Sequence, residues 1–324
     1  MVSLAARIFR FYLVWIRRSQ AQFLTASNMR AHIQAQYIRP QSFAPPQSLG
    51  PDIDIERVDV NDLPLYRISS SPFSPKVGDE DNHPAMLYCH GGAWVNEIVT
   101  QHYKLVAQIA RDTGLDVLVP IYPLIPRPAA TAVQVVAGLH EIMTQIKQPI
   151  VSIGGDSAGG NLAMLLAQHL VRVKSDLISR VRSLVLISPA LDCTMSHPET
   201  KRLVPDDPWL SPDGIHVVGD AWSGGLARSD PRVSPLFGDI ADLPPILLFS
   251  GTHDLLCADA RRLSARFRNG TTSTDMYTWE AGSVELEKFK YVEVEKMIHV
   301  WPLMPSPEGA EARKVIAEFI RKYL

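Results

Sequence analysis

The chain has 324 residues, of which 46% are hydrophobic and 20% are charged, and its formal net charge is −2. This composition fits either one large α/β domain with an inserted segment or two ordinary globular domains. The sequence has no long basic run, which argues against a nucleic-acid partner because phosphate binding needs clustered Lys and Arg side chains. Three widely spaced cysteines predict buried thiols in a reducing compartment rather than disulfides or a metal site: Cys89, Cys193 and Cys257.

Residues 1–39 have a helical pattern, and an apolar segment at residues 8–16 is crowded by arginines. A helix that spans a membrane needs about 20 mostly apolar residues, so this segment is too short. It also makes a poor signal peptide, because Arg10 interrupts it and no small-residue cleavage site follows. Two interpretations of residues 1–20 stay open: a helix packed over the rest of the chain, which we favour, and a peripheral helix at a membrane. We expect a cytoplasmic protein, with membrane association left open.

The centre of the chain alternates short apolar runs with helical stretches. Residues 40–51 are rich in proline and predict a linker, and residues 53–68 predict strands at a sheet edge. Apolar runs follow at 85–89, 116–122, 150–154, 183–188 and 245–250, separated by helical patterns that include 101–113, 129–146 and 158–173. Buried strands separated by helices predict βαβ units and a mostly parallel central sheet flanked by helices. Ligands then bind at the edge where the strands end.

Two segments interrupt this alternation. Residues 193–235 are rich in Pro, Asp and Trp, with weak helical patterns at 199–204 and 212–222, and they predict an inserted cap. Residues 269–287 exceed a usual connection and predict an extra loop before a last sheet strand at 289–295. A helix at 308–323 closes the chain.

A nucleophile motif follows the run at 150–154. The apolar residues lead directly into Gly155-Asp156-Ser157-Ala158-Gly159, and a helical pattern begins at once. Acyl transfer needs a serine oxygen that projects from a sharp turn, and flanking glycines permit the strained backbone of that turn. A random chain of this length contains Gly-x-Ser-x-Gly roughly one time in ten. The strand–turn–helix context therefore adds most of the weight to Ser157 as the nucleophile.

A second motif, His90-Gly91-Gly92-Ala93-Trp94, also follows a predicted strand. Backbone N–H groups in such a loop, together with the one after the nucleophile, stabilise the oxyanion of a tetrahedral intermediate. We therefore predict Gly91, Gly92 and Ala158 as the donors, with His90 bracing the loop rather than acting as a base.

The acid and the base of a serine hydrolase must follow the nucleophile in chain order. Asp254 stands after the apolar strand at 245–250, where an orienting carboxylate belongs. His299 follows the last predicted strand and is the only histidine in the final 70 residues. Neither position is specific alone, but the ordered set of four features predicts a Ser157–His299–Asp254 triad.

These motifs resemble those of the hormone-sensitive-lipase-like, or GDSAG-type, carboxylesterases and lipases of the α/β-hydrolase fold. The resemblance runs from about residue 85 to 320 and includes Ser234-Pro-Leu-Phe-Gly-Asp before the acid. It implies that residues 1–50 and 193–235 form a cap over a catalytic domain of residues 51–192 and 236–324. It further implies hydrolysis of esters with short to medium acyl chains, without a cofactor or a metal ion, and leaves a homodimer open.

The sequence departs from the family pattern at three places. Ala93 replaces the last glycine of the first motif, Tyr122-Pro-Leu-Ile-Pro-Arg replaces Tyr-Arg-Leu-Ala-Pro-Glu, and residues 269–287 are longer than usual. Four aromatic residues are predicted to line a pocket for an apolar substrate, although buried core positions are an equally good interpretation: Trp94, Tyr122, Trp209 and Trp222.

The reaction class predicted from these residues is hydrolysis of a small or medium hydrophobic ester through an acyl-enzyme. The same residues would serve a lactone or thioester hydrolase that acts on a biosynthetic intermediate, and an arylformamidase would use them on an amide. A receptor without catalysis is a remote alternative, because some members of this fold that serve as ligand receptors have lost the catalytic histidine, which is present here as His299.

Overall fold

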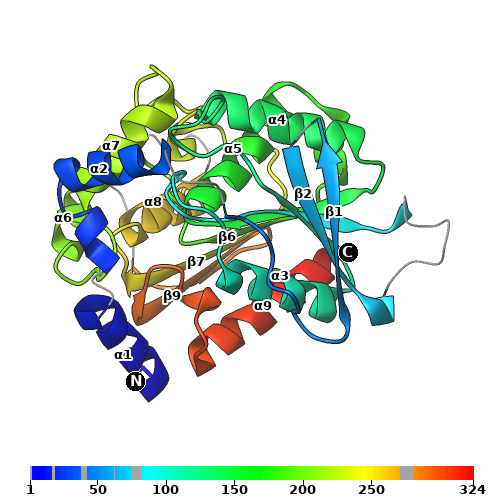
Figure 1. Cartoon of the computed structure of the whole chain (residues 1–324), viewed down its shortest axis with the longest axis horizontal. Coiled ribbons are helices and arrows are strands. Elements are labelled where there is room, and N and C mark those ends of the chain that lie inside the picture. The colour runs from blue at the N-terminus through cyan, green and yellow to red at the C-terminus, as the bar shows by residue number, and fades with distance from the viewer. Residues whose placement is uncertain (1, 17–18, 38–41, 62, 74–81, 271–280) are drawn as a thin grey trace.

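The computed structural model describes residues 2–16, 19–37, 42–61, 63–73, 82–270 and 281–324. Its strands are β1 (Ile53–Val60), β2 (Leu63–Ser70), β3 (Ala85–Cys89), β4 (Asp116–Pro120), β5 (Ile150–Asp156), β6 (Ser183–Ile187), β7 (Ile246–His253), β8 (Val284–Glu285) and β9 (Phe289–Ile298). They form one sheet in the order β1-β2-β4-β3-β5-β6-β7-β9-β8 (Figure 1). Strand β2 pairs antiparallel with β1 and β4, and β8 pairs antiparallel with β9. The pairs from β4 to β9 are parallel.

The central strands are apolar because both of their faces are covered. Every residue of β3, β4, β5 and β6 is buried. Such continuous burial is typical of a parallel sheet between two layers of helices. Strand β1 instead is buried only at its first and last residues and is otherwise half-buried or exposed, as expected of an edge strand. The predicted mostly parallel sheet, with edge strands within residues 53–68, is therefore confirmed.

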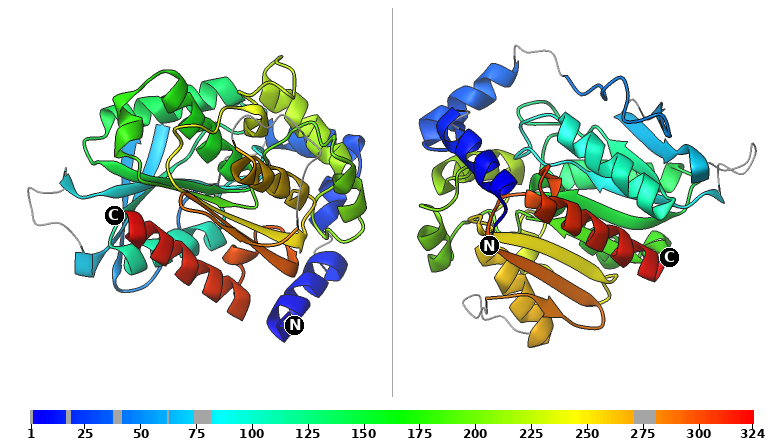
Figure 2. Two further views of the ribbon diagram at one scale, coloured as in Figure 1. Left: turned by 180° about the vertical axis from the view of Figure 1, so that it is seen from behind. Right: turned by 90° about the horizontal axis from the view of Figure 1, so that it is seen from below.

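Helices cover both faces of the sheet (Figures 1 and 2). One apolar cluster joins the sheet to α3 (Thr100–Thr113) and α9 (Pro307–Tyr323). The other joins it to α4 (Ala132–Gln145), α5 (Ala158–Arg172) and α8 (Cys257–Arg268). The helices α3, α4, α5 and α9 match the predicted ranges to within three residues, whereas no range was predicted for α8.

Two further groups of helices pack together at one end of the sheet (Figure 1). The predicted helical segment at 1–39 is broken into α1 (Leu4–Phe11), a π-helical turn (Tyr12–Ile16), a 3-10 turn (Ser19–Gln22) and α2 (Ala26–Tyr37). The insertion contains α6 (Pro198–Leu203) and α7 (Pro212–Ser223), as its weak patterns predicted. The amide of Gly214 at the start of α7 donates to the carbonyl of Phe23 at 3.0 Å. The two groups therefore form one layer, and the division of the chain into a cap and a catalytic domain stays a prediction.

A salt-bridge cluster joins the start of the insertion to α8. The Arg262 guanidinium lies 2.8 Å from Asp192 and 2.9 Å from Asp259, and all three side chains are buried. A buried charge is costly unless it is paired, so these contacts hold residue 192 against the helix that follows β7.

The prediction of an extra loop at residues 269–287 is wrong in its last part. Residues 271–280 lie outside the described residues, but Val284 and Glu285 form β8 against β9. A strand of two residues has no alternating pattern, so the sequence gives no sign of it.

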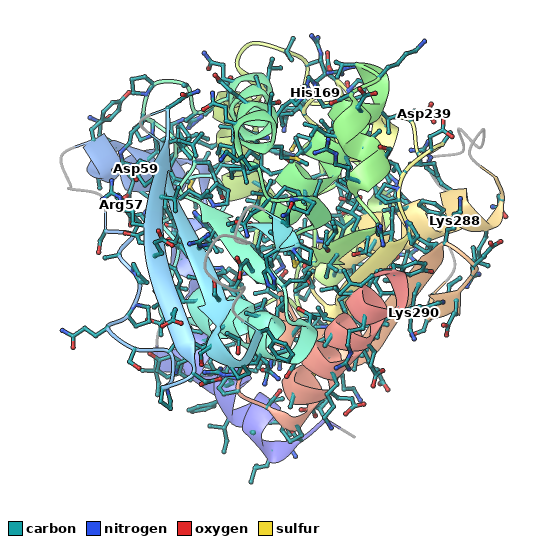
Figure 3. All side chains as sticks on the ribbon, turned by 90° about the vertical axis from the view of Figure 1, so that its right-hand side faces the viewer. Arg57, Asp59, His169, Asp239, Lys288 and Lys290 are labelled. Atoms are coloured by element: carbon teal, nitrogen blue, oxygen red, sulfur yellow. The ribbon has the colours of Figure 1, made fainter. Side chains whose placement is uncertain are left out.

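Both edges of the sheet carry charged side chains (Figure 3). Arg57 pairs with Asp59 on β1 at 2.8 Å, and Lys290 of β9 pairs with Glu285 of β8 at 3.6 Å. Charged edges disfavour pairing with a strand of another chain. Among the described helices, none is both long and apolar enough to cross a membrane.

Candidate active site

The turn after β5 places Ser157 at the point of a sharp bend. Its backbone has φ 53° and ψ −117°, a conformation that a non-glycine residue seldom adopts. A Cβ atom on Gly155 would overlap the carbonyl oxygen of Gly159, and one on Gly159 would overlap that of Cys89. The two glycines therefore let β5 and α5 meet closely beneath the serine, as the motif predicted.

Ser157, His299 and Asp254 form one chain of hydrogen bonds. The Nε2 atom of His299 lies 2.8 Å from Ser157 Oγ, and its Nδ1 atom lies 2.9 Å from Asp254 Oδ2. Asp254 is fully buried, and His299 is 4% exposed. Asp254 stands just after β7 and His299 just after β9. The strand ends thus bring His299 to Asp254, 45 positions away in the sequence, and to Ser157, 142 positions away. The three predicted residues thus meet in triad geometry.

The charges around the triad favour the protonated form of the His299 imidazole. Burial, the largest single effect, lowers the pKa of His299, while the charge and the hydrogen bond of the Asp254 carboxylate raise it. Two further carboxylates, Asp207 and Asp156, act in the same direction, so the pKa of His299 lies above its ordinary value. The imidazolium that forms when a serine gives up its proton is stabilised here.

The loop after β3 approaches the same place. Gly92 has φ 128°, and Ala93 and Trp94 both have φ 55°. The position of Ala93 is thus left-handed, which explains why glycine suits it in the family pattern. The Gly91 amide, however, donates to Asp156 Oδ1 at 3.0 Å. Because that hydrogen is already used, the predicted donor role of Gly91 does not fit this geometry, and Gly92 and Ala158 remain as candidate donors.

The carboxylate of Asp156 holds the loop to the serine turn. It accepts the hydroxyl of Tyr88 at 2.8 Å as well as the Gly91 amide, and His102 Nε2 lies 3.3 Å from its other oxygen. Burial alone would raise the pKa of Asp156, but the charge and hydrogen bond of His102, with the Tyr88 hydroxyl, keep it below its ordinary value. Asp156 therefore stays ionised. The roles of Tyr88 and His102 could not be predicted from the sequence, because each depends on a partner from another element.

His90 has the bracing position that the sequence predicted. Its ring stacks on Tyr122 with centroids 4.6 Å apart, and its Nδ1 lies 2.6 Å from the Gly91 carbonyl. Burial lowers the pKa of His90 to about 4, so this ring is neutral.

Of the four predicted substrate-binding aromatics, two lie at the site. Trp94 lines a pocket beside Ser157, and Trp209 packs edge-on against the His299 ring, with centroids 5.9 Å apart. Trp222 is stacked behind Trp94 at 4.9 Å and is fully buried. Tyr122 is also fully buried, and its hydroxyl donates to the His90 carbonyl at 2.6 Å. Tyr122 and Trp222 therefore lie at buried core positions, the alternative interpretation, and Tyr122 supports the loop from behind.

The pocket beside Ser157 is small and apolar. For a sphere of the size of water its free volume is ≈ 20 Å³. Its lining comes from the N-terminal segment, the Gly92 loop, the serine turn and the insertion: Phe23, Ala93, Trp94, Ser157, Ala158, Ala190, Cys193, Met195, Leu210, Ile215, Val218 and Leu256. The insertion and residues before α2 thus close one side of the site.

A second acid, Asp207, lies next to the triad and was not predicted. Its Oδ2 accepts the amide of Leu255, the residue after Asp254, at 2.9 Å. Its Oδ1 accepts the amides of Trp209 and Leu210 at 2.7 and 2.8 Å. No motif marks this residue, because an aspartate in a proline-rich insertion is ordinary in a sequence.

Comparison with known proteins identifies the family of this chain. Residues 86–283, more than half of the chain, match a family model described as the alpha/beta hydrolase fold. An esterase of Acinetobacter venetianus is 30% identical over 240 residues, which are 72% of this chain and 73% of that protein. A triacylglycerol lipase of Mycobacterium tuberculosis is 39% identical over 186 residues, 55% of this chain but only 37% of the lipase.

A solved structure extends the likeness over the whole chain. An esterase from the bacterial hormone-sensitive lipase family superposes with a TM-score of 0.75 at 25% identity, covering 100% of this chain and 99% of that one. The chain therefore belongs to the α/β-hydrolase fold family, in its hormone-sensitive-lipase-like group.

Replacing Tyr122 by Phe tests its corrected role. The change leaves the buried His90 carbonyl without the hydroxyl, so we expect the free energy of unfolding in denaturant to fall by about 1–3 kcal/mol. We expect kcat on a soluble ester to fall while KM stays nearly constant. Tyr37→Phe, at an exposed position on α2, is the control. An altered KM with unchanged stability would return Tyr122 to the substrate pocket.

Proposed function

We propose that this chain hydrolyses carboxylic esters through an acyl-enzyme on Ser157. The observation that carries the proposal is the unbroken chain of hydrogen bonds from Asp254 through His299 to Ser157 Oγ. The names of the relatives, an esterase and a lipase, support the same reaction class.

In the first half-reaction, Ser157 Oγ attacks the ester carbonyl carbon while His299 Nε2 takes the hydroxyl proton. Asp254 accepts a hydrogen bond from Nδ1 and stabilises the imidazolium. The amides of Gly92 and Ala158 donate to the oxyanion, a contribution that is typically worth about 100-fold or more in rate for each donor. His299 then protonates the leaving alkoxide, and the C–O bond of the ester breaks.

In the second half-reaction, water attacks the acyl-enzyme and gives its proton to His299. The collapse of this intermediate releases the carboxylic acid and returns the proton to Ser157 Oγ. A lactone, thioester or formanilide would pass through the same steps, so a panel of such substrates separates the alternatives.

The pocket supports a short, apolar acyl chain as the preferred substrate. Its free volume of ≈ 20 Å³ holds little more than one water-sized group, and its lining is mostly hydrocarbon. A larger hollow of ≈ 530 Å³ lies between α2 and residues 125–131, but no triad residue lines it. We therefore place the acyl group in the small pocket and expect activity to fall as the chain lengthens.

The Ser157→Ala variant tests the nucleophile. We expect kcat on p-nitrophenyl acetate to fall by about 10⁶-fold, because no other group can form the acyl-enzyme. A fluorophosphonate probe should label the wild type at Ser157 and leave the variant unlabelled. A variant that kept full esterase activity would contradict the proposal.

The pH profile tests the base. His299 must be neutral to accept the serine proton, and Asp254 raises its pKa. We therefore expect kcat/KM to fall as the pH drops through a value above the ordinary histidine pKa of about 6.5. Asp254→Asn should move this acid limb to lower pH and reduce kcat by about 10⁴-fold. An acid limb that stayed in place in the variant would show that another group controls it.

A further inference from the structure

The helix α1 and the π-helical turn after it expose a continuous apolar stripe. The large side chains on it are 43–70% exposed and recur at intervals of three and four residues: Leu4, Ile8, Phe11, Tyr12, Trp15 and Ile16. Contiguous patches of this kind on a protein surface are typical of contact with a partner or a membrane.

The opposite side of this segment is anchored to the protein. Ala6 and Leu13 are buried in the core cluster that contains α9. The Ser3 hydroxyl donates to Glu308 Oε2 at 2.7 Å, and Arg10 Nη2 donates to the Asp206 carbonyl at 3.3 Å. Figure 2 shows α1 beside the start of α9, at the outer end of the molecule. Packing and exposure thus coexist, on opposite sides of one helix.

The charge of this region identifies the partner. The first 51 residues contain no Asp, Glu or Lys and six arginines: Arg7, Arg10, Arg17, Arg18, Arg30 and Arg39. The remaining residues contain 26 of the 32 basic residues and all 34 acidic ones, so the rest of the chain is acidic. A basic segment with an aromatic and aliphatic stripe matches an anionic lipid surface. Contact between two copies through this stripe would instead bring two such basic segments together.

We propose that residues 4–16 dock this protein on the surface of an anionic phospholipid bilayer. The stripe enters the boundary between headgroups and acyl chains, and the exposed Arg7 binds lipid phosphate. Docking leaves the fold unchanged and does not depend on ester hydrolysis.

Sedimentation of the full chain with vesicles tests the proposal. We expect at least about tenfold tighter binding to phosphatidylcholine vesicles with about 30% phosphatidylglycerol than to pure phosphatidylcholine, and weaker binding in high salt. The double variant Phe11→Ala/Trp15→Ala should lose about tenfold or more in affinity, and Arg7→Glu should also bind more weakly. Val133→Ala, at an exposed position on α4, is the control and should bind like the wild type.

Activity on p-nitrophenyl acetate, which is soluble, should be the same in all these variants, so this test is separate from that of the triad. Equal vesicle binding by wild type and double variant would overturn the proposal. So would a wild type that forms dimers, but does not bind vesicles, and that becomes monomeric in the double variant.

A second, independent observation concerns Asp207. Its carboxylate joins the insertion to both partners of the triad, through the Leu255 amide next to Asp254 and through Trp209, whose ring contacts His299. Gln20 Nε2 in turn donates to the carbonyls of Asp207 and Leu210, each at 3.0 Å. One short segment therefore connects the N-terminal region, the insertion and the triad.

We infer that Asp207 is a positioning residue of the proposed hydrolase, which fixes the placement of Asp254 and His299 from the insertion. Burial, and then the charge of Asp254, raise the pKa of Asp207, while the charge of His299 lowers it. As an anion Asp207 in turn favours the imidazolium of His299.

The Asp207→Asn variant tests this role. The asparagine side chain has one oxygen acceptor, so its NH2 group faces either the Leu255 amide or the amides of Trp209 and Leu210, and the hydrogen bonds on that side are lost. We therefore expect kcat to fall by about tenfold, with KM less affected. Loss of the negative charge should also move the acid limb of kcat/KM to lower pH. Asp192→Asn, which weakens a buried salt bridge away from the triad, is the control for destabilisation alone. It should lower the melting temperature and leave the pH profile in place.

A pH profile of Asp207→Asn identical to that of the wild type would overturn the positioning role. The result would leave the proposed hydrolysis intact, since that proposal depends on Ser157→Ala.

Discussion

The backbone of Ser157 is the constraint on which the site depends. Its φ of 53° is maintained because the surrounding chain leaves it no alternative. The Ser157 amide donates to the carbonyl of Ile187 on β6 at 2.8 Å, and its own carbonyl accepts the amide of Ala190 at 3.1 Å. The close contact of Gly155 and Gly159 then fixes the angle between β5 and α5. The strained residue is thus held by strand β6 on one side and by α5 beneath.

Buried carboxylates then connect the parts of the site that the sheet alone does not hold. Asp254 orients the base, Asp156 ties the loop after β3 to the serine turn, and Asp207 reaches the triad from the insertion. Burial, and then the charge of Asp254, raise the pKa of Asp207, whereas His102 and the Tyr88 hydroxyl keep the pKa of Asp156 below its ordinary value. The same charges stabilise the cation on His299. The negative charges therefore lie where they stabilise the positive charge that forms on His299 during the reaction.

The sequence predicted the parts of this structure that depend on local pattern. The buried strands have continuous apolar runs, and Ser157, Asp254 and His299 each follow such a run. Their order along the chain was therefore enough to predict that they form a triad. The roles of Tyr122 and Gly91 could not be predicted, because each depends on a partner from another element: the His90 carbonyl and the Asp156 carboxylate. The strand β8 was missed because two residues carry no period, and Asp207 because a polar residue in an insertion has no pattern to mark it.

The insertion and the N-terminal helices contribute to the active site in a different way from the sheet. The sheet positions the reacting groups, whereas the wall of the pocket comes largely from segments outside it, such as Phe23, Met195 and Ile215. These segments share hydrogen bonds with one another, as between Gly214 and Phe23, and reach the triad through Asp207. A displacement of the wall that would admit a longer acyl chain must therefore also disturb the contacts of Asp207 or those of Gln20 with residues 207–210. Substrate size and the placement of the triad are for this reason not independent in this protein.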